Sequence, residues 1–235
     1  MVGKRFKERM LRKSEKNESR LILALDIPKE QVQKLLEDVS SYIAAVKIGY
    51  PLVLEAGLEI VSKIKKASDL PIIADFKIAD VPHTNQRIAR CSYDAGADAV
   101  IAHAFVGRDS LEAIIKVAEE KGDRGVIVVP NMSHPGASMF IGSVSERMAK
   151  LAVDVGATGV IGPATRPKEI TALRSWVGKE LLILTPGVGA QGAQLGDAIK
   201  SGADFEIVGR AIYTAKSPAK MAKAMRDQIN ESMEG

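Results

Sequence analysis

The sequence predicts a closed (β/α)8 TIM barrel that forms a single domain, and three observations predict it. Eight short apolar runs recur along the chain, and a longer segment of helical periodicity follows each of them. The runs do not alternate apolar with polar residues, which is typical of parallel strands buried on both faces. Their first residues lie mostly 22 to 27 positions apart, with one gap of about 33. A doubly wound open sheet is the alternative architecture.

Each predicted strand is rich in β-branched residues and is bounded by polar, Gly or Pro residues. The eight strands are residues 21–25, 45–48, 72–76, 99–103, 126–129, 159–161, 181–184 and 205–208. Three of the helical segments that lead into these strands end in a similar motif. These motifs are Ala95-Gly96-Ala97-Asp98, Val155-Gly156-Ala157-Thr158 and Ser201-Gly202-Ala203-Asp204. Glycine at that point suits the left-handed residue that caps the C-terminus of a helix.

Charge divides the 235-residue chain into two parts. Residues 1–20 carry eight Lys or Arg and three Glu, whereas the other 25 basic and 26 acidic residues nearly cancel. We therefore predict a basic N-terminal extension over 1–20 and a barrel domain over 21–235. The extension has few apolar residues to bury, so we expect it to be frayed or weakly helical. It has no interleaved aromatic residues, and we predict no nucleic-acid partner.

Composition also bounds the compartment and the cofactors. No run of 18 apolar residues is present, so we predict no membrane-spanning segment. The single cysteine, Cys91, has no partner for an internal disulfide, which indicates a reducing, cytoplasmic location. The three histidines share no metal-ligand spacing, and we predict no metal site.

An acid, a base and a second acid lie within six residues at the end of the third predicted strand. Asp75 and Lys77 fall on one face of that strand, about 7 Å apart, because side chains alternate with a period of two. Asp80 follows three residues later. Charges at the mouth of a buried strand persist when they are paired or when a reaction uses them. The segment therefore indicates either a salt-bridged strand end or the centre of an active site.

Polar residues also follow the other strands, at the end where this fold carries its active sites. Asp26, Lys47 and His103 close the first, second and fourth strands. We interpret His103 as a hydrogen-bonded core histidine rather than a catalyst.

The last two strand ends predict a phosphate site. Gly187, Gly189 and Gly192 would let backbone amides approach an anion closely. Gly209 adds an amide, and Arg210 adds a guanidinium fork suited to phosphate. The position after strands seven and eight strengthens this prediction, because barrels commonly bind phosphate there.

Five motifs occur in an order that resembles one known family. They are KIGYP at 47–51, DFKIADVPHTN at 75–85, MSHPG at 132–136, PGVGAQG at 186–192 and VGRAIY at 208–213. From about residue 21 to about residue 218, the chain resembles the orotidine 5′-monophosphate decarboxylases, most of all their compact archaeal form. It departs from the family pattern at two positions. Asn131 precedes Met-Ser where family members have Glu, and His83 lies inside the 75–85 motif. Neither position is implied to be catalytic.

The resemblance implies loss of CO2 from C6 of orotidine 5′-monophosphate (OMP), giving UMP in the last step of de novo pyrimidine nucleotide synthesis. It implies no metal and no organic cofactor. The catalytic residues it implies are Lys47, Asp75, Lys77 and Asp80, an alternating charge array in which Lys77 protonates C6. A positive charge at C6 suits this reaction because the electron density left there has no conjugated sink. Asp75 would face the departing carboxylate.

The resemblance also implies how the substrate is held. Asp26 and Lys47 would bind ribose hydroxyls, and Ser133 would bind the base. Gln191 would contact the base side and the phosphate, and Arg210 with the Gly209 amide would hold the phosphate. The implied substrate-binding residues are Asp26, Thr84, Ser133, Pro186, Gly187, Val188, Gly189, Gln191, Gly209 and Arg210. The family pattern further implies a homodimer in which Asp80 and Thr84 reach the partner's active site.

Two other functions stay open. A sugar-phosphate decarboxylase or aldolase of the same superfamily would share Asp75, Lys77 and Asp80 but use Mg²⁺ held by carboxylates. Lys47 stands where those enzymes would place an acidic ligand, and a cation there would repel the metal. A non-catalytic nucleotide-binding protein on the same barrel is the second alternative, and the intact charged residues argue against it.

Overall fold

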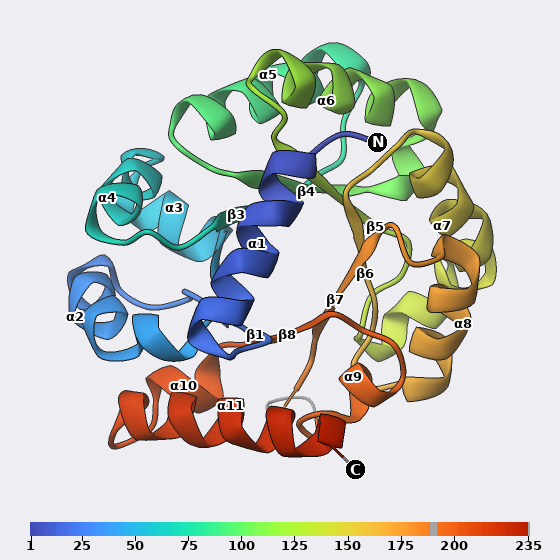
Figure 1. The fold of residues 1–235 in the computed structure, drawn as a ribbon. Coiled ribbons are helices and arrows are strands. Elements are labelled where there is room, and N and C mark those ends of the chain that lie inside the picture. The colour runs from blue at the N-terminus through green and yellow to red at the C-terminus, as the bar shows by residue number, and fades with distance from the viewer. Residues whose placement is uncertain (189–191, 235) are drawn as a thin grey trace.

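Eight parallel strands close into a barrel in the computed structural model, which describes residues 1–188 and 192–234. Each strand pairs with its neighbours in sequence and β8 pairs with β1, so the sheet has no free edge (Figure 1). The strands are β1 (Leu21–Ala24), β2 (Ala45–Gly49), β3 (Ile72–Ile78), β4 (Ala99–His103), β5 (Gly125–Val129), β6 (Gly159–Ile161), β7 (Leu182–Pro186) and β8 (Phe205–Val208). The predicted barrel is confirmed, and each predicted strand end lies within two residues of the observed one.

Helices surround the barrel and connect its strands (Figure 1). The α-helices outside the barrel are α2 (Lys29–Val39), α3 (Tyr50–Ala56), α4 (Glu59–Ala67), α5 (Pro82–Asp94), α6 (Arg108–Glu120), α7 (Ser145–Asp154), α8 (Pro167–Val177), α9 (Asp197–Lys200), α10 (Arg210–Tyr213) and α11 (Pro218–Glu234). Short 3-10 helices are η1 (Ser40–Tyr42), η2 (Ala104–Val106), η3 (Pro135–Met139) and η4 (Gly142–Val144). Across the described ranges, no helix is long and apolar enough to cross a membrane.

Alternate residues of the strands face two separate apolar layers. Ile22, Ile73 and Phe205 belong to the cluster inside the barrel, to which all eight strands contribute. Leu23 and Ile72 belong to the cluster between the strands and the surrounding helices. Both faces of the sheet are therefore apolar, which explains why the strand sequences do not alternate in polarity.

The repeated motif at three helix ends has two structural roles. Its glycines, Gly96, Gly156 and Gly202, have φ angles of 110°, 72° and 107°, as the helix-cap prediction requires. Two residues later, a polar side chain accepts a hydrogen bond from a backbone N–H near the start of the preceding strand. The pairs are Asp98 with Ile72 (2.9 Å), Thr158 with Val126 (3.0 Å) and Asp204 with Ile183 (2.7 Å). The motif thus ends a helix and also ties two neighbouring strands together.

The N-terminal residues form a helix, α1 (Lys4–Asn17), which lies across the N-terminal mouth of the barrel (Figure 1). Val2, Phe6 and Met10 are 3%, 3% and 0% exposed, and Phe6 and Met10 pack into the cluster inside the barrel. Phe6 and Met10 are four residues apart, which places them on one side of the helix, and Val2 precedes it. The expectation of a frayed or weakly helical extension is therefore wrong, because a few apolar residues suffice when they share one face.

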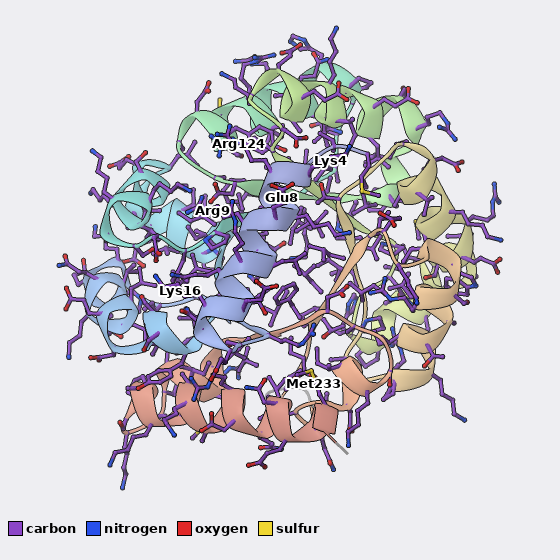
Figure 2. The ribbon with its side chains drawn as sticks, in the orientation of Figure 1. Lys4, Glu8, Arg9, Lys16, Arg124 and Met233 are labelled. Atoms are coloured by element: carbon purple, nitrogen blue, oxygen red, sulfur yellow. The ribbon has the colours of Figure 1, made fainter. Side chains whose placement is uncertain are left out.

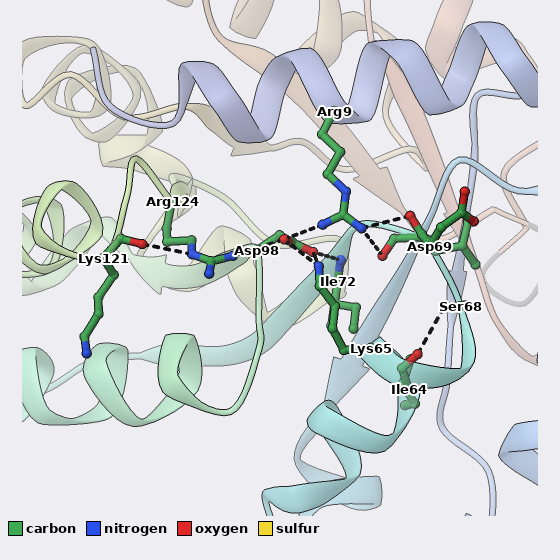
Figure 3. Close-up of polar contacts among 10 residues, drawn as sticks. Arg9, Ile64, Lys65, Ser68, Asp69, Ile72, Asp98, Lys121 and Arg124 are labelled. Carbon is green, nitrogen blue, oxygen red and sulfur yellow. Dashed lines mark hydrogen bonds and ion pairs between the residues drawn. The ribbon is translucent and has the colours of Figure 1, made fainter.

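Ion pairs hold α1 on the barrel. The buried carboxylate of Asp98 lies 2.6 Å from Arg9 Nη1, 2.6 Å from Lys65 Nζ and 3.1 Å from Arg124 Nη1 (Figure 3). Arg9 and Arg124 lie on the same side of α1 (Figure 2). Lys13 of α1 pairs with Asp69 at 2.5 Å. Part of the basic charge of the extension is therefore neutralised by the barrel. A buried carboxylate is screened less by salt than a surface one, so the Asp98 pairs are the more persistent.

Truncation of Met10 tests how much α1 stabilises the fold. Met10→Ala should lower the free energy of unfolding by about 2–5 kcal/mol, the usual range for truncating a fully buried methionine. Urea unfolding followed by circular dichroism measures it. The control, Leu11→Ala, truncates the neighbouring side chain, which is 38% exposed, and should change stability by less than about 0.5 kcal/mol. Equal effects of the two substitutions would show that α1 does not pack as described.

Candidate active site

A cavity of about 370 Å³ opens at the C-terminal ends of the strands, at the opposite end of the barrel from α1. Ten of the predicted site residues line it: Asp26, Lys47, Asp75, Lys77, Ser133, Pro186, Gly187, Val188, Gly209 and Arg210. The other residues that line it are Ala24, Ile101, Val129, Met132, His134, Ile161, Ile207 and Tyr213. The cavity thus combines an apolar base with charged groups, as expected for a site that takes a small polar molecule.

Three charges alternate at one side of this cavity. Asp75 Oδ2 lies 3.0 Å from Lys47 Nζ, and Asp75 Oδ1 lies 2.9 Å from Lys77 Nζ. The side chains of Lys47 and Asp75 are each 9% exposed, and that of Lys77 is 40% exposed. Burial alone would raise the pKa of Asp75, but the charges and hydrogen bonds of the two lysines outweigh it and hold that pKa below its usual range.

Lys77 stands on distorted backbone. Its φ angle is 42°, a left-handed value that a residue with a Cβ adopts at a cost. The pairing of β3 with β4 shifts register between Ala74 and Ile78, which gives the strand an irregularity at this point. The Lys77 side chain lines the cavity beside Asp75. Nothing in the sequence pattern indicated the distortion.

Glycine-rich segments follow β7 and β8 and form another part of the cavity lining. Pro186, Gly187 and Val188 line the cavity, together with Gly209 and Arg210. Gly209 packs so closely that an added Cβ would lie 3.2 Å from the Cβ of Ala24, which explains the need for glycine there. The predicted residues Gly189 and Gln191 lie outside the described residues.

Asp80 and Thr84 do not line the cavity of their own chain. The backbone of Asp80 is fixed by Asn85, whose side chain accepts from the Asp80 N–H and donates to its carbonyl, both at 2.9 Å. Ser110 Oγ also donates to that carbonyl, at 3.0 Å. The Asp80 side chain is exposed and accepts from the N–H of Val81 at 2.6 Å. Among the described residues of one chain, the charge array therefore has three members rather than four.

Comparison with known proteins assigns this barrel to a family. The model of the orotidine 5′-phosphate decarboxylase / HUMPS family matches residues 19–225. The chain belongs to the orotidine 5′-phosphate decarboxylase / HUMPS family. Helix α1 lies outside the stretch that the family model matches.

Relatives support this assignment. The chain is 48% identical over 215 residues to the orotidine 5′-phosphate decarboxylase of Methanosarcina barkeri, covering 91% of this chain and 96% of that one. It is 46% identical over 215 residues to the decarboxylase of Thermococcus kodakarensis, covering 91% and 98%. A crystal structure of the Methanocaldococcus jannaschii decarboxylase with the inhibitor BMP superposes with a TM-score of 0.86, at 40% identity, covering 90% of this chain and 99% of that one.

His103 departs from its predicted environment. It is half-buried at the end of β4, and its Nδ1 is buried without a hydrogen-bond partner among the described residues. Burial lowers its pKa, and the nearby charge of Lys77 lowers it further. The predicted hydrogen bond is therefore not found among the described residues. In this member of the decarboxylase / HUMPS family, the ring packs against Phe105, with ring centroids 4.8 Å apart.

Sequence reasoning also missed Glu206, a fully buried carboxylate on β8. Both of its oxygens accept from the N–H of Gly196, at 3.0 and 3.1 Å, so it anchors the segment that follows the glycine-rich end of the cavity. Burial raises the pKa of Glu206 from 4.5 to about 7, although hydrogen bonds from Gly196 and the amides of α9 oppose the rise. A lone charged residue in an otherwise apolar strand was the available signal.

Glu206 should make the stability of the protein depend on pH. Between pH 4.5 and 7 the folded state keeps a proton that the unfolded state releases, so wild-type stability falls as pH rises through this window. Glu206→Gln keeps an acceptor for Gly196 but cannot ionise. Urea unfolding at pH 5 and pH 8 should show the variant gaining roughly 2–3 kcal/mol relative to wild type at the higher pH. A pH-independent difference would refute the assignment.

Proposed function

We propose that this protein removes the C6 carboxylate of OMP as CO2 and gives UMP, with Lys77 as the proton donor. The observation that carries the proposal is the ion-paired series Lys47, Asp75 and Lys77 at the mouth of the barrel. Membership of the family and relatives named orotidine 5′-phosphate decarboxylase support the reaction. The enzyme is then a carboxy-lyase of pyrimidine nucleotide synthesis, for which we propose a cytoplasmic location.

The charge array suits the chemistry of this decarboxylation. The bond between C6 and the carboxylate breaks, CO2 leaves, and the electron pair stays on C6. The ammonium of Lys77 stabilises that charge as it develops and then transfers its proton to C6. Asp75 and Lys47 keep the ammonium in place, so little reorganisation is needed at the moment of reaction. Asp75 also faces the departing carboxylate, whose repulsion raises the energy of the bound substrate.

The remaining lining residues suit the rest of the nucleotide. We assign the ribose hydroxyls to Asp26 and Lys47, and the base to Ser133. We assign the phosphate to Arg210 and the Gly209 amide, because they offer a guanidinium fork and a backbone that an anion can approach closely. The same assignment gives Pro186, Gly187, Val188, Gly189 and Gln191 to the phosphate and the base side.

A Mg²⁺-dependent sugar-phosphate enzyme fits this geometry less well. Both carboxylate oxygens of Asp75 already contact lysines, at 3.0 and 2.9 Å. A divalent cation bound to Asp75 would have to displace an ammonium and then lie beside it, which like-charge repulsion opposes. We therefore propose a reaction that needs neither a metal nor an organic cofactor.

Incubation of the protein with OMP, followed by pyrimidine absorbance, tests the proposal. We expect one CO2 per UMP and a rate that EDTA leaves unchanged. Lys77→Ala should lower kcat by at least about 10²–10⁴-fold, the usual contribution of a positioned acid. The matched control is Lys63→Ala, which truncates an exposed lysine and should leave the rate unchanged. Activity that disappears with chelator and returns with Mg²⁺ would instead favour the sugar-phosphate enzymes.

We further propose a homodimer in which each active site takes Asp80 and Thr84 from the partner. Large apolar side chains are exposed on the segments that follow β2 to β5, at the same end of the barrel as the cavity. They include Tyr50, Leu54, Val81, Phe105, Met139 and Phe140. Exposed apolar side chains on four successive segments at one end of the barrel suit association with a second copy. Asp80 is exposed beside Val81, and its own chain leaves the charge array one member short, so a second copy is the occupant that completes the site.

Mixing two inactive variants tests the shared site. Lys77→Ala removes the proton donor and Asp80→Asn breaks the array, so each homodimer should be nearly inactive. In a mixed dimer one site collects both defects, while the other combines an intact Lys77 with an intact Asp80 from the partner. After random reassortment, half of the dimers are mixed, and activity should recover to about a quarter of wild type. Mixed dimers that form but stay inactive would place Asp80 in its own chain's site.

A further inference from the structure

A closed ring of polar contacts surrounds Met132, just beyond the end of β5. The Met132 N–H donates to Asn131 Oδ1 at 2.8 Å, and the Met132 carbonyl accepts from Arg166 Nη2 at 2.7 Å. Glu169 closes the ring in two ways. Its Oε2 accepts a hydrogen bond from Asn131 Nδ2 at 2.8 Å, and its Oε1 forms an ion pair with Arg166, 2.7 Å from Nε, without the geometry of a hydrogen bond. We call the side chains of Asn131, Arg166 and Glu169 the Met132 clamp.

The barrel itself does not fix this part of the chain. β5 ends at Val129 and η3 begins at Pro135, so residues 130–134 belong to neither element. In such a segment the backbone conformation depends on the groups that bind its amides and carbonyls. Both polar backbone groups of Met132 are bound by the clamp. The position of the following residue, Ser133, therefore depends partly on Arg166 and Glu169, which come from the segment after β6.

The clamp lies behind the wall of the active-site cavity rather than inside it. Met132 and Ser133 line the active-site cavity, whereas Asn131, Arg166 and Glu169 do not. The three clamp side chains line a second cavity of about 380 Å³, together with Trp176, the single tryptophan of the chain. The clamp can therefore act on a ligand only through Met132 and Ser133.

Glu169 is the junction of the ring. It stands in the first turn of α8, where the helix dipole favours a carboxylate, and its two oxygens bind one clamp partner each. Its charge balances that of Arg166, so the clamp adds no net charge beside the active site. Removal of Glu169 breaks both arms at once and leaves the Asn131 amide, in a residue only 6% exposed, without its acceptor.

We infer that Asn131, Arg166 and Glu169 are positioning residues that set the affinity for the pyrimidine nucleotide by fixing Met132 and Ser133. The inference rests on the proposed function, which assigns Ser133 to the base. Among the described residues, the clamp makes no hydrogen bond or ion pair with Lys47, Lys77 or Arg210, so we expect it to act on binding more than on bond breaking.

Steady-state kinetics and UMP binding by calorimetry test this role in the full-length protein. Glu169→Ala should raise KM for OMP and Kd for UMP roughly tenfold, while kcat changes by less than about twofold. Glu169→Gln keeps one acceptor and should fall between wild type and Glu169→Ala. The matched control is Lys168→Ala, which truncates the exposed neighbour on α8 and should match wild type. Emission from Trp176 should shift in Glu169→Ala without ligand, because the cavity it lines has rearranged.

A second variant separates positioning from general loss of structure. Asn131→Ala should raise KM by a similar factor, and the double variant with Glu169→Ala should be no worse than either single one, because both break one ring. Unfolding midpoints within a few degrees of wild type show that the fold persists. Unchanged KM and Kd in folded Glu169→Ala, or additive effects in the double variant, overturn the inference. Wild-type protein that neither converts OMP nor binds UMP overturns the proposed function instead.

Discussion

The active site depends on one electrostatic constraint, a carboxylate held between two ammonium groups in a nearly dry pocket. Asp75 and Lys47 are each 9% exposed, and charges so placed are stable only when their partners stay within contact distance. Lys47 comes from β2 and Asp75 from β3, so the parallel pairing of these strands sets their separation. That pairing places Gly49 opposite Asp75, where a Cβ would lie 3.2 Å from Asp26 Oδ1 and 3.8 Å from Lys47 Nζ. A closed barrel keeps this register because none of its strands has a free edge along which to slip.

Stability and chemistry occupy opposite ends of the barrel. At the N-terminal end, Asp98, Thr158 and Asp204 bind strand amides, and three cations neutralise Asp98. These contacts are mutually satisfied and favour one rigid arrangement. At the C-terminal end, by contrast, Lys77 has a strained backbone. Burial there disfavours the charge of Asp75, which is stable only because both lysines lie beside it. A strained backbone such as that of Lys77 persists only when the surrounding structure holds it in place. We ascribe that support to the closed sheet and to the polar contacts at its N-terminal end.

The strands and most of the cavity lining could be predicted from the sequence because their signals are local. Apolar runs, helix-ending glycines and polar residues at strand ends each depend on a few consecutive positions, and the barrel then brings Asp26, Lys47 and Ser133 together. Features that depend on distant partners could not be predicted. The burial of Phe6 and Met10, the φ of Lys77 and the packing of His103 on Phe105 each depend on what the rest of the fold places beside them. The Met132 clamp joins residues nearly forty positions apart, and no periodicity records such a pair.

The placement of α1 has a consequence for the order in which the chain acquires its structure. Residues 1–17 leave the ribosome before any of the eight strands, yet Phe6 and Met10 pack against a cluster that includes Phe205, and the Val2 carbonyl accepts from Thr158, 156 residues away. An isolated 14-residue helix is marginal in water, so α1 has no stable partner while the barrel is incomplete. Contacts of such long sequence separation form late. Helix α1 is thus synthesised before the barrel strands but is among the last elements to be buried, and during translation its apolar face stays open to chaperones and to other nascent chains.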